Sequence, residues 1–259
     1  MDSVNKTLYI PLYGKASVSR KGIILQDQKA EEIWAEEGFP LKGKAKSKWL
    51  TYYMGMRSAV FDRWLTGKME AYPEATVLHI GCGMDSRVTR VGEGSHLWFD
   101  VDFPDVIDQR RRYFSETENY RMVAADIRED GWLDQIPGKT AIAVMEGVSM
   151  YLAPEDLKAF LEKLSGKFER LYLLTDCYTV FAAKATKYKN PINEVGVTQV
   201  YGMDNPRALE ASGLTFVREH EMTPQDLINQ LQPLEQRIFR KVFAGRFAEK
   251  LYRLYEYGK

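Results

Sequence analysis

The feature that most constrains the fold is a regular alternation of short apolar runs with helix-like segments between residues 75 and 177. The apolar runs are TVLHI, HLWFDV, YRMVAAD, TAIAVME and RLYLLTD. Among the segments between them, APEDLKAFLEKLSGKF has leucine and phenylalanine at the spacing of one helix face. Strands that alternate with helices are typical of a parallel sheet covered on both faces. We therefore predict an α/β protein with a mostly parallel sheet and helices on both faces.

The segments that flank this alternation differ from it in charge content and in hydrophobic pattern. Residues 1–70 are charged and helical in pattern, and KWLTYYMGMRSAVFDRWLTGKMEAY is typical of one long helix. We expect these residues to form an N-terminal helical cap or lid on a cofactor-binding core of residues 71–177. Residues 178–259 are expected to supply substrate-side loops, late strands and a C-terminal helix. A chain of 259 residues is within the range of one domain, so we predict a single domain over 1–259.

Three segments of the last part carry specific expectations. LTFVREHEM is typical of a late strand. FAAKATKYKNPINEVGVTQVYGMDNP is polar, aromatic and interrupted by Pro and Gly, and is expected to be a lid or substrate loop. IFRKVFAGRFAEKLYRLYEY is expected to be helical, with a stripe formed by Phe239, Val242, Phe243 and Phe247. Such a stripe can lie on a membrane surface, but more often it packs on the protein's own core, which we expect here.

Charge and cysteine content exclude several classes of protein. The 36 basic and 36 acidic side chains cancel, so the chain has no basic field for nucleic acid. The two cysteines, Cys82 and Cys177, imply no disulfide framework and fit a reducing compartment. No window resembles a signal peptide or is apolar for long enough to span a bilayer. We therefore expect a cytoplasmic protein that binds neither nucleic acid nor membrane.

The stretch VLHIGCGMDSR predicts a strand that runs into a glycine turn lying against a nucleotide. Gly81 and Gly83 match the first two glycines of the dinucleotide fingerprint, but Ser86 stands at the third position. The third glycine permits close helix–strand packing and helps to seat a pyrophosphate. Its absence therefore argues against a dinucleotide.

Acidic residues close the strand-like runs that follow. Asp102 lies about 20 residues after the glycine turn, where an acid accepts hydrogen bonds from ribose hydroxyls. Asp100 shares its face of the strand, but Asp102 is nearer the strand end and is preferred. Asp126 and Glu146 close the next two runs, and such a row of carboxylates would repel a phosphate. S-adenosylmethionine, with a ribose, a sulfonium cation and no phosphate, fits this edge of the sheet.

Structural roles are the alternative for these residues. A lone Gly-x-Gly after a strand is common, and the acids can be helix caps or solvated loop residues, so their ordered recurrence is what favours a site. Arg87 is expected to pair with a nearby carboxylate and stiffen the turn, rather than to touch substrate. The chain lacks the second tight pair of ligands that a zinc site needs beside His79 and Cys82. We therefore expect no metal.

Several stretches together resemble the leucine carboxyl methyltransferase superfamily, among them VLHIGCGMDSRVTRV, WFDVDFPDVIDQRRRYF and MEGVSMYL. The closer likeness is to its bacterial branch, the tetracenomycin-type polyketide O-methyltransferases. IPLYGKASVSRKGIILQDQKA, MRSAVFDRWL and ETENYRMVAADI also resemble that branch. The likeness extends from about residue 9 to about residue 176 and fades where the substrate would be bound. It implies a Rossmann-like, S-adenosylmethionine-dependent methyltransferase fold.

The resemblance also implies which residues hold the cofactor. The family's glycine turn corresponds to Gly81 and Gly83, and its acid that binds the ribose corresponds to Asp102. The residues beside the adenine correspond to Asp126 and Ile127. The glutamate near the amino-acid end of the cofactor corresponds to Glu146, and the cations that bind the cofactor carboxylate correspond to Lys15 and Arg57. The chain departs from the family at Ser86, where Thr is common, and at Ser149, where Leu is usual.

Methyl transfer from a sulfonium is an in-line displacement in which the protein orients the reactants and excludes water. A carboxylate acceptor needs no base, whereas a hydroxyl acceptor benefits from one. The candidates are Tyr151, His220, Asp176 and Tyr178, of which only His220 has an ordinary pKa close to neutrality. A structural or surface role explains His220 better and Tyr151 equally well, so the catalytic residue is left open.

These observations lead us to expect an S-adenosylmethionine-dependent O-methyltransferase that releases S-adenosylhomocysteine. Its acceptor would be a hydroxyl or carboxylate oxygen of a small molecule, with a polyketide as one option. The alternatives are a protein C-terminal carboxyl methyltransferase, a non-catalytic S-adenosylmethionine-binding protein of the same fold and, more remotely, a dinucleotide oxidoreductase. The sequence does not indicate the acceptor or the oligomeric state.

Overall fold

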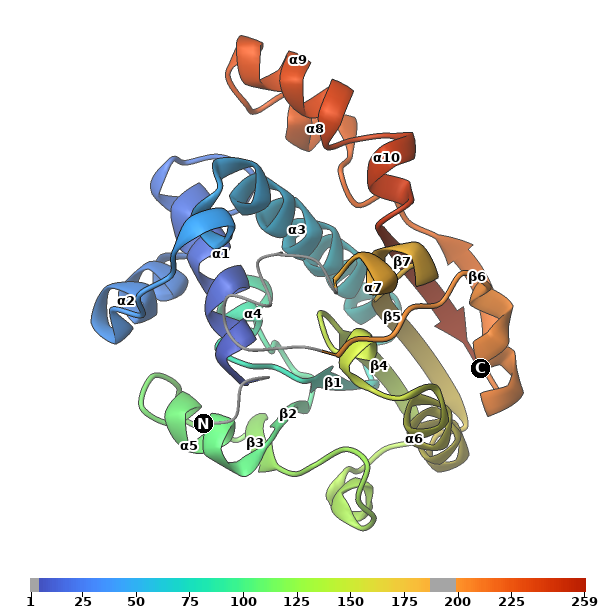
Figure 1. Ribbon diagram of the computed structural model, residues 1–259. Helices are drawn as coiled ribbons and strands as arrows, with labels where there is room; N and C mark the ends of the chain where they lie inside the picture. The colour runs from blue at the N-terminus through green and yellow to red at the C-terminus, as the bar shows by residue number, and fades with distance from the viewer. Residues whose placement is uncertain (1–4, 187–198) are drawn as a thin grey trace.

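A seven-stranded sheet forms the centre of the computed structural model, which describes residues 5–186 and 199–259 (Figure 1). The strand order is β3-β2-β1-β4-β5-β7-β6. The strands are β1 Thr76–Ile80, β2 Trp98–Asp102, β3 Tyr120–Ala124, β4 Thr140–Met145, β5 Arg170–Tyr178, β6 Thr215–Glu219 and β7 Tyr252–Gly258. Strands β1 to β5 are parallel, and β7 is antiparallel to both of its neighbours. The predicted mostly parallel α/β sheet is confirmed, including the late strand in LTFVREHEM.

Helices cover both faces of this sheet. The α-helices are α1 Tyr9–Arg20, α2 Gln28–Glu37, α3 Lys48–Ala71, α4 Arg87–Val91, α5 Pro104–Arg110, α6 Pro154–Lys167, α7 Val180–Ala185, α8 Gln225–Ile228, α9 Pro233–Val242 and α10 Arg246–Glu249. Short 3-10 helices are η1 Asn5–Leu8, η2 Gly43–Lys46, η3 Trp132–Gln135, η4 Ser149–Tyr151 and η6 Pro206–Ser212. Helices α1, α2 and α3 come before the first strand, as the predicted N-terminal helical cap requires.

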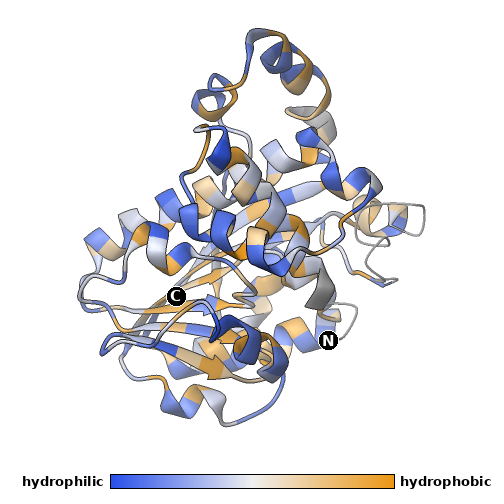
Figure 2. Ribbon diagram, turned by 90° about the vertical axis from the view of Figure 1, so that its left-hand side faces the viewer, coloured by the Kyte–Doolittle hydropathy of each residue, from blue (hydrophilic) through white to orange (hydrophobic). Residues whose placement is uncertain are grey.

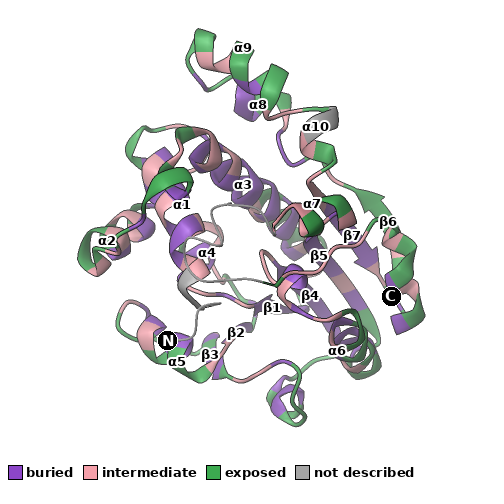
Figure 3. Cartoon of the chain, viewed as in Figure 1, coloured by how far each residue is buried: buried purple, intermediate pink, exposed green. Residues whose placement is uncertain are grey.

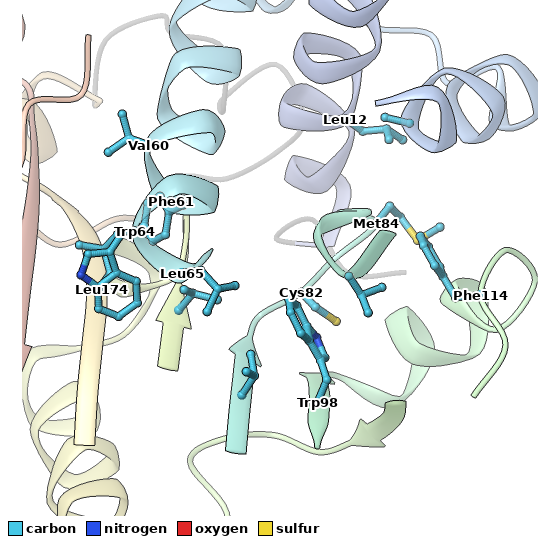
Figure 4. Close-up of a cluster of buried hydrophobic side chains, with 14 of the residues drawn as sticks. Leu12, Val60, Phe61, Trp64, Leu65, Cys82, Met84, Trp98, Phe114 and Leu174 are labelled. Carbon is cyan, nitrogen blue, oxygen red and sulfur yellow. The ribbon is translucent and has the colours of Figure 1, made fainter. Parts of the chain in front are cut away.

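Two hydrophobic cores form because the central strands are apolar on both sides. Every residue of β1 and of β4 is buried, as is usual for parallel strands covered by helices on both faces. On one face, Phe61 and Trp64 of α3 pack in the same cluster as Trp98 of β2 and Leu174 of β5 (Figure 4). The opposite face carries the apolar side of α6. Figure 3 shows the buried residues concentrated in the central strands and along α3.

The long helix α3 continues through Gly55, and that glycine allows close packing with α1. An ideal Cβ at Gly55 would lie 2.9 Å from Cγ2 of Val18, and one at Gly14 would lie 2.9 Å from Cβ of Met54. Each helix therefore offers a glycine where the other presents a side chain. The two helices form the part of the cap that lies next to the sheet edge where the strands end (Figure 1).

The predicted C-terminal helix is wrong in its second half. The segment forms α9 up to Val242, then the short α10, and its last residues form β7 between β5 and β6. Gly245 has φ +84°, a left-handed conformation that interrupts the helical path. In β7, Leu254 faces one core, and Tyr255 and Tyr257 face the other. This period of two suits a strand buried on both faces, and it outweighs the helical spacing of the phenylalanines that precede it.

The stripe on α9 is also divided. Phe239 is fully buried, but Val242 is 45% exposed. Helices α8 and α9 lie beyond one end of α3, away from the sheet, and α10 leads from them to β7 (Figure 1). Only part of the stripe therefore packs on the core as predicted.

Hydrophobic residues gather in the strands of the sheet (Figure 2). Among the described residues, no helix combines the length and apolarity needed to cross a bilayer. The predicted lid or substrate loop begins as helix α7, and its residues 187–198 lie outside the described part of the chain.

Candidate functional site

A cavity of about 1070 Å³ lies where the carboxyl ends of the parallel strands meet the N-terminal cap. In parallel α/β sheets, ligands bind at this edge. All eight residues predicted to hold the cofactor line it: Lys15, Arg57, Gly81, Gly83, Asp102, Asp126, Ile127 and Glu146. Residues from four strand ends and from two cap helices are thus brought to one place.

The glycine turn after β1 needs glycine for two separate reasons. Gly81 and Gly83 have φ of +64° and +50°, where other residues are strained. An ideal Cβ at Gly81 would also lie 2.2 Å from Cγ2 of Val148. The hydroxyl of Ser86, in the position of the fingerprint's third glycine, donates a hydrogen bond to Asp27, which caps α2. Ser86 therefore ties the turn to the cap.

Asp102 lines the cavity at the end of β2. Its two carboxylate oxygens accept hydrogen bonds from the backbone N–H groups of Gly83 at 2.7 Å and Phe103 at 2.8 Å. Burial raises the pKa of Asp102 to about 6, although both N–H groups oppose that rise. Asp100, two residues earlier, is fully buried and ion-paired with Arg110. Of the two acids, Asp102 is the one that the cavity reaches.

Asp126 and Ile127 line the cavity just after β3. The Asp126 carboxylate accepts hydrogen bonds from the backbone N–H and from Nε of Arg128, at 3.0 and 2.9 Å. These bonds to Arg128 lower the pKa of Asp126, so the group is a paired anion.

Glu146 directly follows β4 and lies at the centre of a buried ion network. It accepts hydrogen bonds from Nε of Arg57 and from the hydroxyl of Ser58, each at 2.9 Å, and from Arg87. Burial favours the neutral acid, but the charges of Arg57 and Arg87 prevail and lower the pKa of Glu146 to about 2. Glu146 is therefore ionised at neutral pH.

The two cations assigned to the cofactor carboxylate are paired with acids of the protein. Lys15 lies 3.0 Å from Asp85, and burial lowers the pKa of Lys15. Arg57 bonds Glu146 through Nε and reaches Asp176 at 3.0 Å and the Tyr252 hydroxyl at 2.8 Å through Nη1. Arg57 thus connects two carboxylates from neighbouring strands.

These pairings correct the expectation of an uncompensated row of acids. The carboxylates do share one cavity, but Asp126 and Glu146 are each paired with arginine, and Asp102 accepts two backbone hydrogen bonds. Burying an unpaired charge costs too much free energy for a fold to tolerate several side by side. The site is polar and nearly balanced in charge.

Arg87 has the structural role predicted for it. It is fully buried and donates from Nε to Asp62 at 2.7 Å, while its Nη2 also reaches Asp85 at 3.3 Å. Arg90 bonds the same Asp62 and also Asp27. This cluster could not be predicted from the sequence, because Asp27, Asp62 and the glycine turn are far apart in the chain.

The four candidate bases have different environments. Tyr151 and Tyr178 line the cavity, and burial raises the pKa of each. Asp176 is fully buried, and burial raises its pKa. His220 lies after β6, outside the set of residues described as lining the cavity, with Nε2 2.7 Å from Glu256. We therefore withdraw His220 as a base, because Glu256 holds it away from the reactants.

The other end of the same cavity is aromatic. It is lined mainly by residues of α3, η4, α7 and the C-terminal segment, among them Trp49, Leu50, Tyr53, Met54, Met150, Tyr151, Tyr178, Val242, Phe243, Leu251 and Tyr252. Trp49 and Phe243 stack there with ring centroids 5.1 Å apart and planes 16° apart. Lys44 is the cationic residue described at this end, and Arg57, paired with Glu146 and Asp176, lies where the two ends meet.

Most of this aromatic end could not be predicted from the sequence. Tyr252 lies in a segment with helical spacing, and Trp49 and Tyr53 lie in an apolar helix. No local motif marks them, because they meet only after the chain folds.

Neither His79 nor the cysteines take part in a metal site in the part of the chain described. His79 Nδ1 lies 3.0 Å from Asp100, and Cys82 and Cys177 are both buried and free. No group of three or more His, Cys, Asp or Glu among the described residues is arranged to hold a metal ion.

Comparisons with known proteins agree with this geometry. A family model described as leucine carboxyl methyltransferase matches residues 9–165. Tetracenomycin polyketide synthesis O-methyltransferase TcmP of Streptomyces glaucescens is 29% identical over 98% of this chain and 97% of its own. An S-adenosyl-L-methionine-dependent methyltransferase of Gibberella zeae is 27% identical over 81% of this chain and 78% of its own.

Solved structures share the fold at low identity. Magnesium protoporphyrin IX methyltransferase from Synechocystis, with bound S-adenosylhomocysteine, superposes with a TM-score of 0.53 at 14% identity, covering 90% of this chain and 93% of its own. A protein from Thermobifida fusca, described as a possible methyltransferase, gives a TM-score of 0.57 at 14% identity, covering 95% and 94% of the two chains.

Proposed function

Since the chain belongs to the leucine carboxyl methyltransferase family and is an S-adenosylmethionine-dependent O-methyltransferase, we propose that it methylates an oxygen of a small aromatic molecule. The observation that carries the proposal is the composition of one cavity. One of its ends is built from glycines and paired acids, and the other from aromatic and apolar side chains.

The first end fits the cofactor. Two glycines leave the backbone of the turn open to close approach, as a nucleoside requires. Asp102 would accept hydrogen bonds from the ribose hydroxyls, and Asp126 and Ile127 would lie beside the adenine. Glu146, Lys15 and Arg57 would hold the amino-acid end, with the buried cations meeting its carboxylate.

The second end fits a planar apolar acceptor. Aromatic rings bind flat apolar molecules through large buried area with little loss of conformational entropy. Trp49 and Phe243 come from opposite ends of the chain, so their stack joins the N-terminal cap to the C-terminal segment across this end. We propose that the cap helices α1 and α3 act together with α9 as the cover over both ligands.

The protein's contribution to the reaction is orientation and shielding. When bound, S-adenosylmethionine supplies an electrophilic methyl group on a cationic sulphur. The cavity walls would hold the acceptor oxygen against the cofactor and keep water out, and such orientation can contribute roughly 7–11 kcal/mol toward lowering the barrier. No nucleophilic side chain is needed for a direct displacement.

A carboxyl acceptor is the second candidate, and one observation favours it. Lys44 is the cation described at the aromatic end, and a carboxylate acceptor would be attracted to it. The same argument applies to the exposed C-terminal carboxylate of a protein. A carboxylate would give a methyl ester, whereas a hydroxyl would give a methyl ether.

One experiment separates these outcomes. The protein is incubated with radiolabelled S-adenosylmethionine and cell extract, and the products are divided by size and by treatment with base. Label in small aromatic molecules supports the proposal, with base-stable label indicating ethers and base-labile label indicating esters. Label only in protein identifies a protein carboxyl methyltransferase, and failure to bind S-adenosylhomocysteine in calorimetry would contradict the cofactor site itself.

A further inference from the structure

The aromatic end of the cavity contains a hydroxyl that shares a hydrogen-bond donor with a buried carboxylate. Tyr252, the first residue of β7, lines the cavity. Nη1 of Arg57 donates hydrogen bonds both to the Tyr252 hydroxyl, at 2.8 Å, and to the carboxylate of Asp176, at 3.0 Å, so the hydroxyl and the carboxylate lie beside the same nitrogen. Asp176 is fully buried and is not among the described residues that line the cavity. Tyr252 therefore lies between the cavity and a carboxylate that the acceptor does not reach.

The other carboxylates of the site are poorly placed to receive a proton from the acceptor. Glu146 is held by two arginines that lower its pKa to about 2. Asp126 is bonded to Arg128, at the cofactor end. Asp102, also at that end, accepts two backbone hydrogen bonds. Asp176 is the carboxylate that lies next to the Tyr252 hydroxyl. It is also paired with Arg57, at 3.0 Å, but burial outweighs the arginine there and raises the pKa of Asp176.

We propose that Tyr252 is a catalytic residue that takes the proton of a hydroxyl acceptor while it passes its own phenolic proton to Asp176. This proposal rests on the proposed function, with a hydroxyl as the acceptor. The acceptor oxygen forms the new bond to the methyl carbon with one of its electron pairs. The carbon–sulphur bond breaks and leaves its pair on sulphur.

The protons and charges balance in this step. The electron pair of the acceptor O–H bond stays on that oxygen as its proton moves to the Tyr252 oxygen. The Tyr252 proton forms an O–H bond with the Asp176 carboxylate. One positive charge on sulphur and one negative charge on Asp176 disappear together, so no new charge is buried.

The groups around Tyr252 suit this transfer. Arg57 from α3 stabilises negative charge on the Tyr252 oxygen, and Glu146 after β4 opposes it from the far side of Arg57. The Tyr252 ring meets Tyr178 edge to face, with centroids 4.9 Å apart, and Tyr53 in the same way at 6.3 Å. These rings hold the hydroxyl at a fixed place in the cavity wall.

The test uses 7-hydroxycoumarin, an aromatic phenol whose anion has its own absorbance band, bound to protein saturated with S-adenosylhomocysteine. We compare the wild type, Tyr252→Phe and the matched control Tyr255→Phe. Tyr255 lies on the same strand but faces the opposite core. Near neutral pH, the bound probe should be at least about twofold more ionised than the free probe in the wild type and in the control. In Tyr252→Phe, and in Asp176→Asn, that excess should disappear.

Every other result contradicts either the hydroxyl relay or the proposed function. If S-adenosylhomocysteine does not bind the wild type, the proposed function itself fails. If it binds but 7-hydroxycoumarin does not, or if the bound probe is no more ionised than the free probe, the hydroxyl relay is wrong and the cofactor site stands. If Tyr252→Phe binds both ligands and keeps the excess ionisation, Tyr252 does not receive the proton.

Discussion

The two ends of the cavity differ in how the chain builds them. The cofactor end comes mostly from short segments that each follow a strand, between Gly81 and Glu146. The aromatic end is assembled from segments near Trp49, Tyr178 and Tyr252, which are far apart in the sequence. The first end depends on backbone conformation and paired charges, and the second on side-chain packing between distant elements. Substitutions at the two ends should therefore have separable effects, on cofactor binding and on acceptor binding respectively.

The largest effect is expected at the glycine turn. Gly81→Ala places a Cβ against Val148 and a side chain at φ +64°. Overpacking costs about 1–3 kcal/mol and the left-handed conformation about 1–2 kcal/mol. We expect urea denaturation to show that combined loss, and calorimetry to show at least a ~100-fold loss of S-adenosylhomocysteine affinity because the turn is displaced.

The control for this substitution is Gly67→Ala. Gly67 lies in α3 with no atom within 4 Å of an ideal Cβ, so alanine should stabilise the helix by about 0.5–1 kcal/mol. Unchanged affinity in Gly81→Ala would show that the cofactor end does not depend on the backbone of this turn.

The next largest effect is expected for Asp102→Ala. Loss of a charged acceptor of ribose hydrogen bonds costs about 1.5–3 kcal/mol, which is roughly a 10- to 150-fold weaker affinity for S-adenosylhomocysteine. Asp108→Ala removes an exposed carboxylate from nearby α5 and should leave the affinity unchanged. Equal affinities for the two variants would disprove the ribose role, and loss of aromatic probe binding in Asp102→Ala alone would break the separation between the two ends.

A smaller, pH-dependent effect follows from the same residue. The pKa of Asp102 is about 6 in the folded protein, above the ordinary value of about 4. Since the folded state binds this proton more tightly than the unfolded chain, ionised Asp102 lowers stability above pH 6, and this penalty disappears as pH falls toward 4. Cofactor affinity should move the other way, because the protonated acid is a poorer acceptor for ribose hydroxyls.

The comparison with Asp102→Asn isolates this titration from other groups. Wild-type affinity for S-adenosylhomocysteine should fall by up to about tenfold per pH unit below pH 6 and approach that of the variant. The difference in unfolding free energy between the two proteins should shrink over the same range. A constant ratio of affinities between pH 7 and pH 5 would contradict the raised pKa.

The difference between the two ends of the cavity also explains which features could be predicted from the sequence and which could not. The β1 turn, the acids at the strand ends and the parallel sheet could be predicted because each is encoded within one short segment. The pairing of Glu146 with Arg57 and Arg87 could not, since the partners come from three separate elements. Tyr252 was hidden because helical spacing in the phenylalanines before it masks a short strand, whose pairing with β5 and β6 is set only by the folded sheet.

The smallest effect tests whether the aromatic end is a packed wall or only a collection of side chains. Trp49 and Phe243 stack in a nearly parallel arrangement, and such pairs contribute about 0.5–1.5 kcal/mol beyond the area they bury. A double-mutant cycle of Trp49→Ala and Phe243→Ala in urea should give a coupling free energy in that range. Both single variants should keep wild-type affinity for S-adenosylhomocysteine and lose affinity for 7-hydroxycoumarin. A coupling of zero would mean that the N-terminal cap and the C-terminal segment do not depend on each other here, and a matching loss of cofactor affinity would mean that the two ends of the cavity form one cooperative site.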